Sequence, residues 1–303
     1  MKHILKGIIP PVVTPLLNND ELDVIGLKNL VNHLIDGGVH GLFLLGTNGE
    51  ATSLSYKLRK ELIIKACEFT NNRVPVLVGI TDTSFNGTLD IADFAHNAGA
   101  DAVVVAPPYY MPISQNEMVE YLRHVVSEIK LPVVLYNMPS CTKLHMTVET
   151  VKKAKELGVI GIKDSSGDMS YLYSLIEEFK DSSDFAILAG TELYLPDMIM
   201  NGGDGAVAGG ANIAPRLFVD LYNASVNKDL DKIDKLRHNV IQLYNTIYKI
   251  GDSPMRITKG TKCALSVMGI CNGYMALPLR EFEGEERETV NKYVEDLKRE
   301  GIL

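Results

Sequence analysis

Lys163 closes a short apolar run that ends Gly161-Ile162-Lys163-Asp164. Burial disfavours the charged ammonium form, so a lysine at the end of a buried strand is a candidate amine nucleophile for a carbonyl carbon. The plainer alternative is a structural lysine that reaches solvent or pairs with a carboxylate such as Glu50. Lys163 alone does not decide between the two.

Polar side chains also follow three other apolar runs. They lie in the segments 46–50 (Gly-Thr-Asn-Gly-Glu), 108–110 (Pro-Tyr-Tyr) and 136–139 (Tyr-Asn-Met-Pro). Taken singly, Thr47 and Asn48 are ordinary turn residues, and Tyr136 is an ordinary amphipathic core residue. The 46–50 turn lacks the Gly-Lys-Ser/Thr of a nucleotide-binding loop, so we expect its backbone amides to suit a small carboxylate instead.

Eight short apolar runs, separated by segments with helical periodicity, organise the first two thirds of the chain. They cover residues 7–13, 41–46, 74–80, 102–106, 132–136, 159–163, 185–190 and 205–208. Nearly continuous apolar runs are typical of parallel strands that helices cover on both faces. We therefore predict an α/β fold, a closed (β/α)8 TIM barrel over residues 1–224. An open doubly wound sheet usually has fewer strands.

After the eighth run the pattern is helical only, over residues 215–226, 230–250, 255–268 and 285–303. One helix closes a barrel, so the remainder predicts a C-terminal helical region at 225–303. The active site of such a barrel lies at the C-terminal ends of its strands, where the polar segments would meet. Because side chains alternate along a strand, Lys163 and Gly161 share a face, and we expect the glycine to leave room for a ligand.

The composition argues against several other classes of function. A net charge of −8 and a pI near 5.4 offer no basic surface, so we expect no nucleic-acid partner. No stretch approaches the roughly 20 apolar residues of a spanning helix, which predicts a cytoplasmic protein without a membrane partner. The four cysteines and seven histidines lack the spacing of metal sites, so we predict no metal.

Together these segments resemble the dihydrodipicolinate synthase and N-acetylneuraminate lyase family of pyruvate-dependent class I aldolases. The resemblance runs over essentially all 303 residues, and the segment 203–206 (Gly-Asp-Gly-Ala) also carries it. It implies that Lys163 forms a Schiff base with the keto carbon of pyruvate or another 2-keto acid. The covalent lysine imine would then take the place of a cofactor, and we expect none.

The same resemblance implies roles for other residues. Tyr136 would act as the proton shuttle, and Thr47 would link it to Tyr110, which the family donates across a tight dimer interface into the neighbouring site. Thr47 and Asn48, with the carbonyl of Val207, would hold the pyruvyl carboxylate region. We therefore expect a homodimer, or a homotetramer built as a dimer of dimers.

Two features bear on the substrate. Synthases of the family carry an arginine shortly after Tyr-Asn-x-Pro, but Cys141 stands there in this chain, with Lys143 as a candidate substitute. Gly190 and Glu192 lie where sugar-acid lyases of the family bind substrate hydroxyls. We predict a carbon–carbon lyase that uses or releases pyruvate and an aldehyde, acting on a 2-keto-3-deoxy sugar acid. The alternatives are 4-hydroxy-tetrahydrodipicolinate synthase, an N-acetylneuraminate lyase-like enzyme and a non-catalytic paralogue that binds a keto acid.

Overall fold

A computed structural model describes residues 5–303, so the first four residues of the predicted barrel lie outside the description. Its main sheet has eight parallel strands in the order β1-β10-β9-β8-β7-β6-β5-β4. The strands are β1 (Gly7–Ile8), β4 (Leu42–Leu44), β5 (Val76–Gly79), β6 (Ala102–Val105), β7 (Val133–Asn137), β8 (Gly161–Asp164), β9 (Ala186–Ala189) and β10 (Gly205–Ala206). Each overlaps one of the eight predicted runs.

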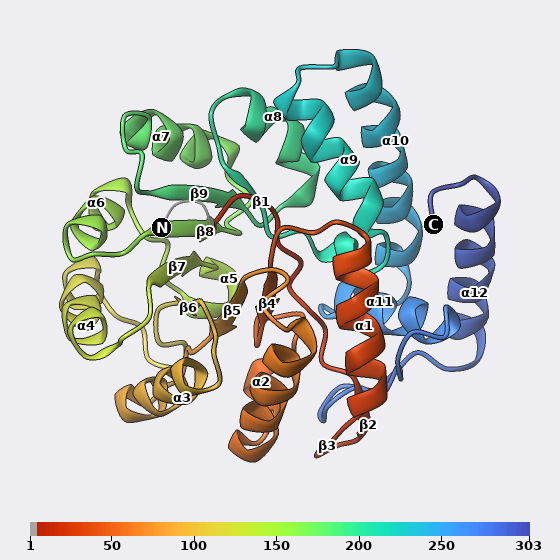
Figure 1. Ribbon diagram of the computed structural model, residues 1–303, viewed down its shortest axis with the longest axis horizontal. Coiled ribbons are helices and arrows are strands. Elements are labelled where there is room, and N and C mark those ends of the chain that lie inside the picture. The colour runs from red at the N-terminus through yellow and green to blue at the C-terminus, as the bar shows by residue number, and fades with distance from the viewer. Residues whose placement is uncertain (1–4) are drawn as a thin grey trace.

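The segment that follows β1 closes the sheet into a barrel. Pro11 forms a parallel bridge with Phe43 of β4, and the Val12 amide donates to the Phe43 carbonyl at 2.8 Å. Since β1 also pairs with β10, this segment joins the two ends of the strand order, β1 and β4. Helices surround the sheet (Figure 1), and the (β/α)8 prediction is confirmed.

Six of the eight outer helices begin at a Ser, Thr or Asp whose side chain accepts a hydrogen bond from a free amide of the first turn. Helix α4, for example, has a capping box in which Ser114 and Glu117 exchange side-chain to backbone hydrogen bonds. The outer helices are α1 (Val24–Asp36), α2 (Tyr56–Thr70), α3 (Phe85–Asn97), α4 (Gln115–Glu128), α6 (Val148–Glu156), α7 (Met169–Phe179), α8 (Leu195–Met200) and α9 (Pro215–Val226), and a short α5 (Pro139–Thr142) follows β7.

The inside of the barrel is packed with side chains from alternate strand positions, among them Phe43, Val104 and Leu188. Gly161 faces this interior, but a Cβ there would lie 2.7 Å from the Ala186 carbonyl oxygen and 3.1 Å from a Leu5 methyl carbon. The expectation that this glycine leaves room for a ligand is therefore wrong. The glycine lets two neighbours pack closely below Lys163.

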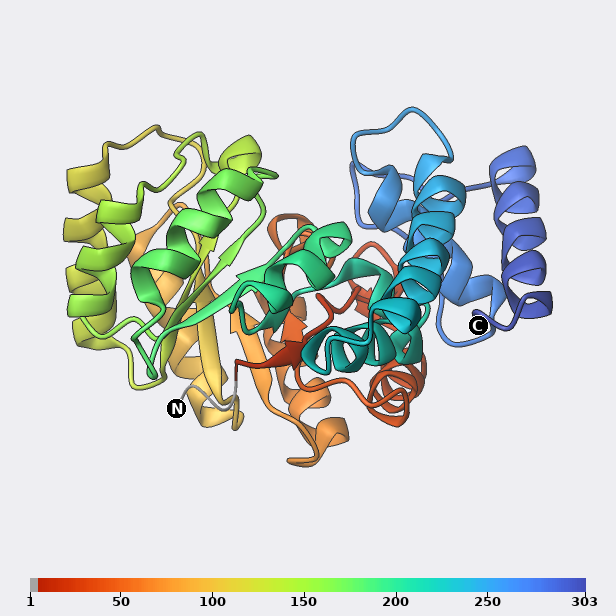
Figure 2. The ribbon, with the colours of Figure 1, turned by 90° about the horizontal axis from the view of Figure 1, so that it is seen from above.

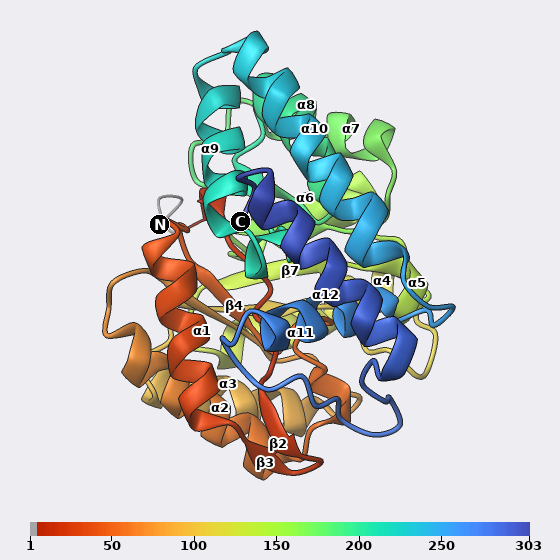
Figure 3. The same cartoon turned by 90° about the vertical axis from the view of Figure 1, so that its right-hand side faces the viewer.

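Three helices follow the barrel: α10 (Leu230–Thr246), α11 (Arg256–Val267) and α12 (Gly284–Arg299). They lie together on one flank (Figures 2 and 3), and α10 packs along α9. The boundary predicted at residue 225 falls within the last turn of α9. A small antiparallel hairpin of β2 (Leu16–Asn18) and β3 (Glu21–Leu22) was not predicted. None of the helices within residues 5–303 is long and apolar enough to cross a membrane.

Candidate active site

Lys163 and Tyr136 lie side by side at the barrel mouth. They are register partners on the neighbouring strands β7 and β8. The Lys163 Nζ lies 4.0 Å from the centroid of the Tyr136 ring and 5.2 Å from that of Phe43. Lys163 is 5% and Tyr136 8% exposed, so the amine is held against aromatic faces and largely removed from water.

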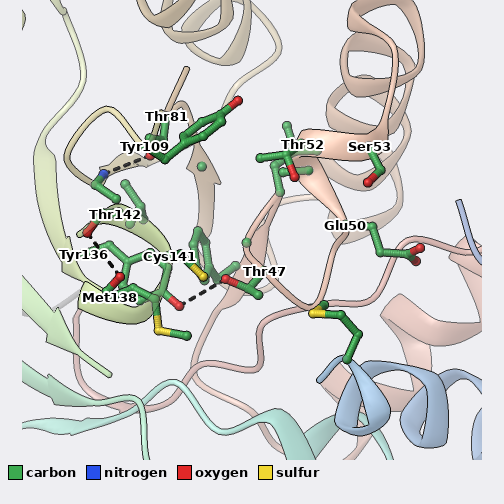
Figure 4. A pocket seen from close by; sticks show the side chains of 18 of the residues that line it. Thr47, Glu50, Thr52, Ser53, Thr81, Tyr109, Tyr136, Met138, Cys141 and Thr142 are labelled. Atoms are coloured by element: carbon green, nitrogen blue, oxygen red, sulfur yellow. Dashed lines mark hydrogen bonds between the residues drawn. The ribbon is translucent and has the colours of Figure 1, made fainter. Parts of the chain in front are cut away.

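The Lys163 amine has no hydrogen bond or ion pair with any other residue in the 5–303 range. Glu50, the carboxylate considered as its alternative partner, is instead bound to Lys262, at 2.7 Å. In Figure 4 the Glu50 side chain points away from Tyr136. The alternative of a Lys163–Glu50 pair is therefore wrong, and the amine faces an open cavity.

The 46–50 turn follows β4 and borders Tyr136. The Thr47 Oγ1 lies 3.2 Å from the Tyr136 hydroxyl (Figure 4). The amides of Gly49 and Glu50 close the turn by donating to the carbonyls of Gly46 and Thr47. Among the residues that the structure describes, no such bond engages the amides of Thr47 and Asn48. The turn can therefore offer two donors to a carboxylate.

Backbone strain marks both ends of this turn. Leu45 has a φ of 56° and Glu50 a φ of 54°, both in the left-handed region. A residue with a Cβ pays roughly 1–2 kcal/mol for that conformation, so the surroundings must hold it. The surrounding structure, and not the local backbone preference, therefore sets the conformation of this turn.

Two cavities meet at Tyr136. The larger, of about 440 Å³, is shown in Figure 4 and includes Cys141 and Tyr109 in its lining. The smaller, of about 290 Å³, is lined by Lys163 and by six other predicted site residues, namely Thr47, Asn48, Tyr136, Gly190, Glu192 and Val207. Thr47, Tyr136 and Met138 border both cavities. The fold therefore gathers most of the predicted site around one connected space.

Glu192 forms a buried polar wall of the smaller cavity. Its Oε2 accepts from the Gly210 amide at 2.7 Å. Its Oε1 and the Tyr248 hydroxyl are both buried, and the interaction between these two groups lowers the pKa of Glu192 against the effect of burial. Burial raises the pKa of Glu192 to about 7, so near neutral pH the carboxyl can act as a donor as well as an acceptor.

A second pair, Asn137 and Asp164, for which no role was predicted, directly follows Tyr136 and Lys163 in the chain. The Asn137 amide nitrogen donates to Asp164 Oδ1 at 2.7 Å, and Ser166 Oγ donates to Asp164 Oδ2 at 2.8 Å. Burial raises the pKa of Asp164, which these bonds oppose. Because Asn137 and Asp164 are also register partners, they fasten the ends of β7 and β8 together. Their place next to the two site residues in sequence was the available signal.

Tyr110 does not reach the site within its own chain. It is 75% exposed and borders neither cavity. Lys143 donates to the Tyr110 carbonyl at 3.4 Å and lies 5.9 Å from its ring. Lys143 lines neither cavity. The role of Tyr110 in a neighbouring subunit stays a prediction.

Few charged side chains line the two cavities. Among the described residues that line them, Lys163 is the only lysine, and there is no arginine. Within residues 5–303, no group of three or more His, Cys, Asp or Glu side chains is placed to hold a metal ion.

The chain is similar in sequence and in fold to known proteins. Residues 4–297 match the dihydrodipicolinate synthetase family. The fold is similar to a solved dihydrodipicolinate synthase of Bacteroides thetaiotaomicron, with a TM-score of 0.95 and 47% identity over 98% of this chain and 100% of that one. A 4-hydroxy-tetrahydrodipicolinate synthase of Methanocaldococcus jannaschii is 32% identical over 97% of this chain and 99% of its own length.

A third relative carries another activity in its name. YagE of Escherichia coli, provisionally named a 2-dehydro-3-deoxy-D-gluconate aldolase, is 35% identical over 79% of this chain and 80% of its own length. Its structure in complex with pyruvate aligns with a TM-score of 0.91 and 31% identity, covering 97% of this chain and 99% of that one.

Proposed function

The chain belongs to the dihydrodipicolinate synthetase family, and from this premise we propose that Lys163 carries a class I aldolase reaction on pyruvate. The enzyme is a carbon–carbon lyase, as its relatives are. The observation that carries the proposal is the buried Lys163 amine, which faces the smaller cavity beside Tyr136 without a charged partner in the described chain.

The first step is imine formation. The Lys163 amine adds to the keto carbon of the substrate, and the carbinolamine loses water to give a protonated imine. The free amides of Thr47 and Asn48 would bind the substrate carboxylate, and Val207 also lines the smaller cavity. The imine then acts as an electron sink for the bond beside it.

Tyr136 would move the proton in the second step. For a 2-keto-3-deoxy acid, the Tyr136 oxygen first gives its own proton to solvent and then takes the proton of the C4 hydroxyl. The C3–C4 bond breaks, and its electron pair forms the enamine as the aldehyde leaves. The phenol returns the proton to C3, and water hydrolyses the imine to pyruvate and free Lys163. Thr47, at 3.2 Å from the phenolic oxygen, would orient it.

A 2-keto-3-deoxy sugar acid is the substrate class that the cavity lining favours. A sugar acid brings several hydroxyls, and the smaller cavity presents Thr191, Ser165 and the buried Glu192 to them. An aldehyde with its own carboxylate would need a cationic partner, yet Cys141 occupies the predicted arginine position. Losing a charged hydrogen bond costs roughly 1.5–3 kcal/mol.

The second candidate is 4-hydroxy-tetrahydrodipicolinate synthase, which condenses pyruvate with aspartate semialdehyde. It is favoured by the 47% identity to the Bacteroides thetaiotaomicron protein over nearly the whole chain. The pyruvate half of the chemistry is the same for both candidates, so only the aldehyde half separates them.

Parallel assays of the two reactions test the proposal. We expect faster cleavage of 2-keto-3-deoxygluconate, or of a related acid such as N-acetylneuraminate, than condensation of pyruvate with aspartate semialdehyde. The variant Cys141→Arg should raise the condensation rate, with Cys141→Ser as the matched control. Efficient condensation by the wild-type enzyme would reverse the order of the two candidates.

We also propose that Tyr110 acts in the site of a partner subunit, which makes a homodimer the smallest active unit. The support is its exposure and its absence from both cavities of its own chain. Mixed Lys163→Ala and Tyr110→Phe subunits should then regain activity, because one of the two sites in each heterodimer would carry neither change. A mixture no more active than its parts would count against the exchange.

A further inference from the structure

One face of α11 is docked on the 46–50 turn. Thr258 and Lys262 are four residues apart on this helix, so their side chains lie on the same face. The Thr258 hydroxyl donates to Asn48 Oδ1 at 3.3 Å, and the Lys262 Nζ donates to Glu50 Oε1 at 2.7 Å. The C-terminal helical region therefore contacts the turn at two of its five residues.

The contact with Glu50 is fully enclosed. The Lys262 side chain is 0% and the Glu50 side chain 1% exposed. The second carboxylate oxygen of Glu50 accepts from the Ala276 amide at 2.8 Å, in the segment that follows α11. Both oxygens of one buried carboxylate are thus held by the C-terminal region, an arrangement that solvent does not loosen.

Glu50 in turn fixes the part of the turn that borders the reacting groups. Its backbone is in the left-handed region, which the chain does not adopt without support. Its amide donates to the Thr47 carbonyl at 3.1 Å. A shift of Glu50 would therefore move Thr47, whose hydroxyl meets Tyr136 and whose amide is one of the two free donors.

We propose that Lys262 is a positioning residue of the active site, holding the 46–50 turn in the conformation that binds the substrate carboxylate. This inference rests on the proposed function, because it assigns that turn to the pyruvyl carboxylate. The C-terminal helices would then help to hold the active site in its binding conformation. Thr258 supports the same turn through a second, weaker contact.

The test compares pyruvate dependence in variants of the pair. The double variant Glu50→Gln with Lys262→Met removes both charges and leaves an acceptor for the Ala276 amide. The initial rate at which borohydride traps the pyruvate adduct is measured by intact mass at increasing pyruvate concentrations. For the double variant, the pyruvate concentration that gives the half-maximal rate should be about tenfold higher than for the wild type, because about one hydrogen bond is lost. The plateau rate should stay near that of the wild type.

Lys259→Met is the matched control. Lys259 is also a buried lysine of α11, but its Nζ lies 4.6 Å from the Phe282 ring centroid and makes no contact with the turn among the described residues. We expect its pyruvate dependence to equal that of the wild type. A folded double variant with wild-type pyruvate dependence would overturn the inference.

Two further measurements keep the outcome decisive. If the double variant does not fold, Lys262→Gln, which keeps a hydrogen-bond donor for Glu50, must show a smaller rise in the same direction, and no rise overturns the inference. If the wild type forms no adduct at any pyruvate concentration, the proposed function fails instead. Hydrogen–deuterium exchange of the peptide containing residues 46–50 then decides the inference, since exchange must be faster in the double variant than in Lys259→Met.

Discussion

Lys163 and Lys262 are both buried, but under opposite conditions. Lys163, at the end of β8, is 5% exposed, faces a cavity and has no charged partner in the described chain. Lys262, in α11, is 0% exposed and pairs with Glu50 at 2.7 Å. Burial lowers the pKa of Lys262, and Glu50 opposes that change. An enclosed carboxylate makes one lysine structural, and its absence leaves the other available for chemistry.

The difference follows from the elements that carry the two residues. A strand end at a barrel mouth directs Lys163 toward a space that a ligand can enter. The middle of a helix that is buried on nearly every side leaves Lys262 no exit to water, so an acidic partner is required. The following changes should break or sharpen this contrast.

Lys163→Ala should have the largest effect on activity. Without the amine no imine forms, and we expect kcat for cleavage to fall by at least roughly 10⁴-fold. The free energy of unfolding should stay the same or rise, because an unpaired buried amine is removed. A steady-state assay with urea denaturation measures both quantities. Retention of more than a hundredth of the activity would contradict the assignment of Lys163.

Tyr136→Phe should leave imine formation in place and slow the proton transfer. We expect kcat to fall roughly 10²–10⁴-fold while borohydride still traps pyruvate on the enzyme. The phenyl ring preserves the contact with the Lys163 amine, so the variant separates packing from acid–base chemistry. Loss of trapping together with turnover would mean that Tyr136 acts earlier than we propose.

Lys262→Met should lower the stability of the fold more than the activity, the opposite of Lys163→Ala. It leaves the Glu50 carboxylate buried without its cation, so we expect the free energy of unfolding to fall by roughly 3–5 kcal/mol. Adduct formation at saturating pyruvate should persist in the folded fraction. Urea denaturation, with Lys259→Met for comparison, measures the loss. An unchanged unfolding midpoint would remove the structural half of the contrast.

Glu192 extends the comparison to a buried acid. Its pKa rises from 4.5 to about 7 on folding, so between these pH values the folded state binds more protons than the unfolded state. The free energy of unfolding should therefore fall as pH rises through this window, by about 3 kcal/mol in total. Glu192→Gln should flatten that slope. Equal slopes for both proteins in urea denaturation from pH 4.5 to 7.5 would exclude the effect.

The strands could be predicted from sequence because parallel strands covered on both faces are apolar throughout. All eight runs were found, and their order along the chain reappears around the barrel. The β2–β3 hairpin was missed because its turn, residues 19–20, is Asn-Asp and only short apolar pieces flank it. Strands of two or three residues are held by tertiary contacts that no local pattern records.

Site residues could be predicted from sequence only where a reactive side chain stands at the end of a predicted strand. Lys163 and Tyr136 end apolar runs, so their place at the mouth follows from the fold class. The Lys262–Glu50 pair joins residues 212 positions apart, and no spacing rule links them. The available signal for Lys262 was its place before Cys263, Ala264 and Leu265 in a predicted helix. The misjudged space at Gly161 shows the same limit, since Leu5 fills it from another part of the chain.

Borohydride reduction in the presence of pyruvate, followed by peptide mass spectrometry, tests the contrast between the two buried lysines most directly. Reduction of the imine leaves a stable adduct on the lysine that formed it. We predict one adduct per chain, located on Lys163, with Lys262 unmodified. An adduct on Lys262, or a folded enzyme that acquires no adduct at saturating pyruvate, would contradict the account.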